Sequence, residues 1–284
     1  SCEIDKYARQ IYAKNFGHEP EQSNITKVNP KDLPDFEVLC AGFPCQSWSV
    51  AGARAGFEDE RGGLFYEIIK IAREKQPQIL FLENVKGLLS HQQGGSFREM
   101  LYTLNEVGYD VEWQVLNSKY FVPQNRERLF IIGHLRGKGR REILPIGQNR
   151  RVNDESHGKT SNNEVGHTGA ITANYWKGYG AGRPFIAEPK LKLVKNSRDD
   201  SYRIYSPDGI ARTLRSHPGG MGKMTGAYKM KDYRVRRLTP VECERLQGFP
   251  DGFTSGVSDT QRYKMLGNAV TVPVISYVVS SFKN

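Results

Sequence analysis

The chain has 284 residues, of which 38% are hydrophobic, and it carries a formal net charge of +10. This hydrophobic content supports a packed core and excludes a disordered tail. The longest apolar stretches are too short to cross a bilayer, and no basic-then-apolar leader precedes them, so we expect a soluble, cytoplasmic protein. Its four cysteines lack metal-ligand spacing, which predicts reduced thiols and no zinc.

The pattern of apolar residues in 1–135 predicts alternating strands and helices. Short apolar or alternating runs predict strands at 36–41, 79–83, 111–116 and 129–133. Apolar residues at helical spacing predict helices around 64–72 and 97–104, the first ended by Pro77. This alternation indicates an α/β fold with a doubly wound, mostly parallel sheet, whose ligands bind outside the carboxyl ends of the strands.

Residues 136–237 lose this rhythm and predict a small, loop-rich second domain. The segment holds 22 Lys and Arg against 9 Asp and Glu, a balance of +13, whereas the rest of the chain carries −3. Such asymmetry is typical of polyanion binding, although a solvated loop-rich face gives the same count. Regular structure resumes where Thr239 precedes Pro240, a helix-start pattern, and residues 238–284 are expected to complete the first domain.

Three short motifs put reactive side chains near predicted strand ends. Residues 42–46 supply the thiol of Cys45, residues 83–85 the acid Glu83, and residues 124–128 the guanidiniums of Arg126 and Arg128. This set can add a nucleophile to an electron-poor heterocycle. The two arginines would share one face of a strand, where they could bind a base carbonyl, a phosphate or the thiolate. Taken singly, the same residues fit a buried thiol, a helix cap and a solvated strand face.

In this order, the motifs resemble those of the C5-cytosine DNA methyltransferase family, and the resemblance runs from Ser1 to about Phe282. It implies S-adenosylmethionine as methyl donor, S-adenosylhomocysteine as product, and double-stranded DNA as partner. It also implies a bacterial restriction-modification enzyme that acts near the nucleoid and needs no metal. Cys45 would attack cytosine C6 while Glu83 protonates N3. Because a duplex hides C5 and C6, the base would have to be flipped out.

The resemblance further implies contacts to the cofactor and to DNA. Glu3 matches an acid that binds the ribose, Ile4 a position that usually stacks an aromatic ring on adenine, and Asn24 a position that accepts from the adenine amino group. The full set of implied cofactor contacts is Glu3, Ile4, Asn24, Ile25, Pro44, Leu64, Asn268 and Val270. The implied DNA contacts are Arg203, Thr213, Gly219, Gly220 and Lys223. Solvated carboxylates, ordinary turns and core packing are the alternatives.

One family feature has no counterpart ahead of Glu3. Family members open with a strand and a Phe-x-Gly-x-Gly turn that holds the methionine half of the cofactor. We therefore expect the chain alone to bind S-adenosylmethionine weakly, and to gain affinity when that segment is supplied in cis or by a second polypeptide. The chain together with such a segment is called the completed enzyme below. A transfer RNA methyltransferase and a DNA-binding subunit without activity of its own are the alternative functions.

Overall fold

The structure, a computed structural model, describes residues 1–44, 63–138, 143–144, 192–195, 204–206, 208–215, 227–229 and 235–282. The chain divides into two compact units. Unit 1 is Ser1–Leu116 with Glu127–Ile146, and unit 2 is Asn117–Arg126 with Gly147–Asn284. The expected three-part division at residues 135 and 237 differs from this partition, since the C-terminal helices cluster with unit 2, and it stays a prediction.

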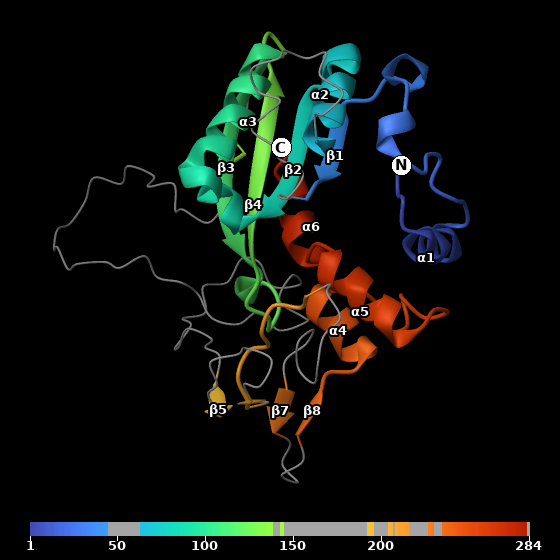
Figure 1. Ribbon diagram of the computed structural model, residues 1–284, viewed down its shortest axis with the longest axis vertical. Coiled ribbons are helices and arrows are strands. Elements are labelled where there is room, and N and C mark those ends of the chain that lie inside the picture. Colours follow the sequence, from blue (N-terminus) through green and yellow to red (C-terminus); the bar gives the residue numbers. More distant parts are fainter. Residues whose placement is uncertain are drawn as a thin grey trace, which may run out of the picture. The chain divides into compact units, whose positions relative to one another are not determined.

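Unit 1 is built on a four-stranded sheet flanked by helices (Figure 1). The strands follow the order β1 (Val38–Gly42), β2 (Ile79–Val85), β4 (Glu127–Leu135) and β3 (Tyr109–Asn117). β1 and β2 run parallel, whereas β2 and β4 run antiparallel. The helices are α1 (Lys6–Phe16), α2 (Leu64–Lys75) and α3 (Gly95–Glu106), with 3-10 turns at Ile25–Lys27, Pro30–Asp32, Lys86–Leu89 and His91–Gly94. All four predicted strands and both predicted helices are confirmed.

The core of unit 1 lies between one face of this sheet and the helices α2 and α3. Leu80 and Leu82 of β2 and Leu129 of β4 are fully buried in the cluster that includes both helices. Alternate residues face the other side, where Phe81 stacks on Phe130 with ring centroids 5.9 Å apart. Because side chains alternate along a strand, the same side of β2 that carries Phe81 also carries Glu83.

Unit 2 contains a second small sheet and three C-terminal helices. Its strands, in spatial order, are β5 (Leu193–Lys195), β6 (Ile204–Tyr205), β7 (Ala227–Lys229) and β8 (Val235–Arg237). The helices are α4 (Pro240–Gln247), α5 (Asp259–Asn268) and α6 (Val272–Ser280), and a 3-10 turn spans Ser118–Tyr120. The short strands agree with the loop-rich composition of this part of the chain.

The start of α4 confirms the helix signal at Thr239. The Thr239 hydroxyl accepts the Glu242 amide at 3.3 Å, and the Glu242 carboxylate accepts the Thr239 amide at 2.7 Å, which closes a capping box. The helix ends at Gln247 and is capped by Gly248, which has a φ of 80°. A Cβ there would lie 2.4 Å from the Pro273 side chain, so only glycine fits both the backbone angle and the close packing.

Glu242 also predicts how stability depends on pH. Arg236 donates to its carboxylate at 2.7 and 2.8 Å, and chiefly this hydrogen bonding lowers the pKa of Glu242 to about 2. Ionised Glu242 therefore stabilises the folded state fully above its ordinary pKa of 4.5, and this stabilisation is lost as the pH falls toward 2. Glu242→Gln and Arg236→Gln should each flatten the fall in melting temperature across this range. An unchanged slope in both variants would contradict the assignment.

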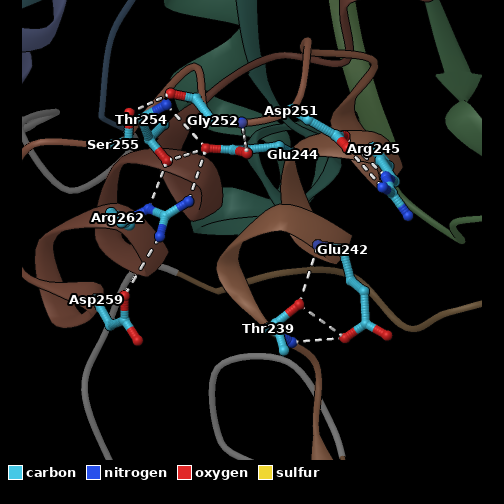
Figure 2. A network of polar contacts seen from close by, with 10 residues as sticks. All are labelled: Thr239, Glu242, Glu244, Arg245, Asp251, Gly252, Thr254, Ser255, Asp259 and Arg262. Carbon is cyan, nitrogen blue, oxygen red and sulfur yellow. Dashed lines mark hydrogen bonds and ion pairs between the residues drawn. The ribbon is translucent and has the colours of Figure 1, made fainter.

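The connection between α4 and α5 is fixed by a buried acid, Glu244 (Figure 2). Its carboxylate accepts the Gly252 amide at 2.7 Å, the Thr254 amide at 2.8 Å and Arg262 Nη2 at 3.1 Å. Burial alone would raise the pKa of Glu244, but these hydrogen bonds outweigh it and lower the pKa. Glu244 thus stays charged in the core of unit 2 because its partners replace water.

Two features are absent from the part of the chain that the structure describes. None of the helices in this part of the chain combines the length and the apolar character that crossing a bilayer requires. Nor does any group of three or more His, Cys, Asp and Glu side chains there form a candidate metal site.

Candidate functional site

Glu83 lies beside the end of β1, the strand that precedes Cys45 in the sequence. Its register partner is Gly42, the last residue of β1. A Cβ at Gly42 would come within 3.3 Å of Glu83 Oε2, so the absence of a side chain there leaves room for the carboxylate. The strand predicted over 79–83 is two residues longer, since β2 continues to Val85, and Glu83 is not its last residue. Cys45 itself lies outside the described residues.

Asn84 fixes the backbone that leads toward Cys45. Its side chain is 2% exposed, and Nδ2 donates to the Phe43 carbonyl at 2.8 Å. Its Oδ1 accepts the Val85 amide at 2.8 Å. This role of Asn84 was not predicted from the sequence. The available signal was a polar amide inside an otherwise apolar strand, because a buried amide must find hydrogen-bond partners.

Glu83 and Arg128 form an ion pair on one face of unit 1. Arg128 lies opposite Val85 across the β2/β4 ladder, so it is the diagonal neighbour of Glu83. Arg128 Nε lies 2.9 Å from Glu83 Oε1, and the two side chains are 16% and 18% exposed. Burial lowers the pKa of Arg128, and the neighbouring carboxylate only partly opposes this. The pair therefore brings two of the four predicted catalytic residues together.

Arg126 does not share a face with Arg128. β4 begins at Glu127, so Arg126 precedes the strand, and the boundary between the two units falls between them. The Asn117 side chain explains this start, because its Oδ1 accepts the Arg126 amide at 3.1 Å and holds that residue in the preceding loop. The predicted shared strand face is therefore wrong for this pair.

Residues 123–126 are joined to the predicted recognition segment in unit 2. The Asn125 amide donates to the Ala211 carbonyl at 2.8 Å, and the Ala211 amide donates to the Pro123 carbonyl at 2.7 Å. The Thr213 hydroxyl adds a hydrogen bond to the Asn125 carbonyl. No sequence spacing signals this pairing, since almost 90 residues separate the two segments. Thr213 is half-buried, and it uses its hydroxyl within the protein.

Unit 1 carries most of the predicted cofactor residues. Glu3 Oε1 accepts the Asp5 amide at 2.8 Å, just ahead of α1, and Ile4 is 72% exposed. Asn24 Oδ1 accepts both the amide and the hydroxyl of Thr26, at 3.0 and 2.9 Å. The oxygen expected to face the adenine amino group is thus already engaged, and in this structure Asn24 caps a 3-10 turn.

The remaining predicted cofactor residues differ in exposure. Ile25 packs against the core of unit 1. Pro44 is exposed, and Leu64, the first residue of α2, is half-buried. In unit 2, Asn268 is exposed at the end of α5, and Val270 is half-buried two residues later. Four of the five predicted DNA contacts, Arg203, Gly219, Gly220 and Lys223, lie outside the described residues.

Comparison with known proteins establishes the family. The C-5 cytosine-specific DNA methylase profile matches residues 1–284. The chain belongs to this family. It is 38% identical over 286 residues to the Type II methyltransferase M.HhaI of Haemophilus parahaemolyticus, spanning 98% of this chain and 85% of that protein. It is also 38% identical to the Type II methyltransferase M1.ScrFI of Lactococcus lactis subsp. cremoris, over 97% of this chain and 69% of that protein.

Solved structures share the fold at lower sequence identity. The S. pombe Dnmt2 methyltransferase superposes with a TM-score of 0.65 at 19% identity, covering 98% of this chain and 88% of that one. A putative DNA modification methyltransferase of an E. coli prophage gives a TM-score of 0.63 at 19% identity. These matches confirm the predicted methyltransferase fold class, while the family match confirms the predicted enzyme class, a DNA cytosine-5-methyltransferase.

Proposed function

We propose that this chain transfers a methyl group from S-adenosylmethionine to C5 of a cytosine flipped out of a specific DNA duplex sequence. The transfer would proceed through a covalent bond between Cys45 Sγ and cytosine C6. The observation that carries the proposal is the family match over the whole chain, joined to the Glu83–Arg128 pair beside Gly42. Gly42 is three residues before Cys45 in the sequence, so the predicted nucleophile follows the strand that pairs with Glu83.

Glu83 is the group suited to activate the base. Cytosine C6 is a poor electrophile until N3 is protonated or hydrogen-bonded, and a carboxyl group can supply that proton. Arg128 holds this carboxyl at 2.9 Å and restricts its orientation on the strand face. Once Sγ has added to C6, C5 becomes nucleophilic, and loss of the C5 proton later expels the thiol.

S-adenosylmethionine would supply the electrophilic methyl group that C5 accepts. The described residues fit its adenosine half in part. Ile4 offers an exposed apolar surface to the adenine, and Glu3 offers a carboxylate, anchored by the Asp5 amide, to the ribose hydroxyls. Asn268 and Val270 of unit 2 are assigned to the cofactor by the family motif alone; the first is exposed and the second is half-buried. Asn24 does not fit as an acceptor, because Thr26 already donates to its oxygen.

DNA is favoured over RNA as the substrate, since the family and the two relatives above are named for DNA methylation or as Type II methyltransferases. The basic balance of residues 136–237 supports a polyanion partner but does not separate the two nucleic acids.

Offering duplex DNA and transfer RNA side by side tests the proposal. The completed enzyme should convert cytosine to 5-methylcytosine in a mixed-sequence duplex, as read by mass spectrometry of the digested nucleosides. Transfer RNA should acquire at least about 100-fold less 5-methylcytosine than the duplex, because the recognition segment would be built for a groove of duplex DNA. Methylation of transfer RNA alone would replace the proposal, and methylation of neither in the presence of bound cofactor would favour the DNA-binding subunit.

A further inference from the structure

The environment of Arg126 is unlike that of a residue that touches a substrate. Its side chain is 1% exposed. Nη1 donates to the Leu214 carbonyl at 3.1 Å, and Nη2 donates to the carbonyls of Gly267 and Ala269 at 2.9 and 2.7 Å. A planar guanidinium presents donors in a rigid fork, so it can fix several chain segments at once. Arg126 thus binds three backbone carbonyls that come from two distant parts of unit 2.

Two of these carbonyls lie on either side of Asn268. Asn268 is the last residue of α5, and the final carbonyls of a helix have no partner within the helix. Arg126 supplies donors to this turn from inside the unit, while the Asn268 side chain stays exposed. Fixing the carbonyls before and after a residue fixes its backbone, and with it the direction in which its side chain leaves the turn.

The third carbonyl belongs to Leu214, in the predicted recognition segment. Thr213 of the same segment donates to the Asn125 carbonyl, immediately before Arg126 in the chain. A single loop, residues 123–126, therefore holds both the segment expected to meet DNA and the turn expected to meet the cofactor. Lysine cannot replace arginine here, because one ammonium group cannot reproduce the fork.

We propose that Arg126 is a positioning residue, which rests on the proposed function: its guanidinium holds Asn268 ready for the adenosine half of S-adenosylmethionine and ties that turn to the recognition segment. This replaces the catalytic role that the motif predicted for Arg126. It leaves Arg128 as the arginine beside the reacting base. The cofactor affinity of this enzyme would then depend on a residue that does not contact the cofactor.

The test is calorimetric titration of the completed enzyme with S-adenosylhomocysteine, which needs neither turnover nor a known DNA target. Arg126→Lys should weaken this binding about tenfold, since the turn loses part of its support. In an Asn268→Ala background, the same substitution should have less than about a twofold effect, because the positioned side chain is gone. Equal effects in both backgrounds would overturn the proposal.

Arg262→Lys is the matched control. Arg262 is another largely buried arginine of unit 2, 14% exposed, and it contacts Glu244, Thr254 and Asp259. The Arg262→Lys variant should lower the melting temperature at least as much as Arg126→Lys does, while its affinity for S-adenosylhomocysteine stays within about twofold. If Arg262→Lys also lost affinity about tenfold, Arg126 would be only a residue that stabilises the unit in general.

Further outcomes separate the two proposals. If Arg126→Lys does not fold, Arg126→Met keeps most of the side-chain volume without a buried charge and serves in its place. If neither variant folds, Arg126 acts in folding and the inference fails. If the unaltered completed enzyme does not bind S-adenosylhomocysteine, the proposed function fails, and the inference that rests on it fails with it.

Discussion

Cys45→Ala should abolish methylation by the completed enzyme, with a fall in rate of at least about 1,000-fold. The reason is chemical: without sulfur addition at C6, C5 stays a poor nucleophile. The affinity for duplex DNA should change little, because the thiol contributes almost nothing to polyanion binding. Initial rates with a labelled methyl donor, measured at saturating DNA, provide the readout.

Two other thiols serve as controls. Cys40 is an exposed residue of β1, five positions before Cys45, and Cys40→Ala should keep the rate within about twofold. Cys243 is fully buried in unit 2, and burial raises the pKa of its thiol to about 12, so it is unsuited to attack. A Cys45→Ala enzyme that retained its rate, or a Cys40→Ala enzyme that lost it, would show that the nucleophile is misassigned.

Glu83→Gln should lower kcat by roughly 100- to 10,000-fold, the range expected for losing a general acid. The amide keeps the size of the side chain, yet it has no carboxylic proton to deliver to N3 and cannot pair as an anion with Arg128. Cofactor and DNA affinities should stay within about threefold, because the acid acts in the transition state rather than in binding. Single-turnover kinetics with saturating DNA separates the two effects.

Glu127→Gln is the control for this substitution. Glu127 lies on the same strand as Arg128 and forms an ion pair with Lys86 at 3.1 Å. The Glu127 side chain, however, is 43% exposed. Exposed ion pairs contribute little, so this variant should retain both rate and stability. If Glu83→Gln weakened DNA binding in proportion to its loss of rate, Glu83 would be a binding residue and not the acid.

The four strands of unit 1, its helices α2 and α3, and its fold class could be predicted because they follow local rules. A short apolar run predicted β2, apolar residues at helical spacing predicted α2, and Thr239 before Pro240 predicted the start of α4. Each signal lies within about a dozen residues. The chemistry of the site followed from the order of three motifs rather than from any one of them.

The contacts of Arg126 and Asn84 could not be predicted in the same way. Arg126 and Gly267 are 141 positions apart, and Asn84 and Phe43 are 41 apart, so no periodicity links them. The shared-face prediction for the two arginines assumed a strand from residue 126, but the Asn117 side chain holds that residue in a loop. The prediction for Asn24 did not take account of a local competitor, because the Thr26 hydroxyl two residues later donates to the oxygen that was expected to accept from adenine.

The most direct test of the central claim is peptide mapping of a trapped complex. Duplex DNA carrying 5-fluorocytosine at the target position cannot lose a C5 proton, so the sulfur–C6 bond should persist after methyl transfer. Mass spectrometry of the digested complex should then find the modified nucleotide, with one added methyl group, on the peptide that contains Cys45. Attachment at Cys40 or another residue, or a complete absence of adduct in an enzyme that methylates ordinary duplex DNA, would contradict the account.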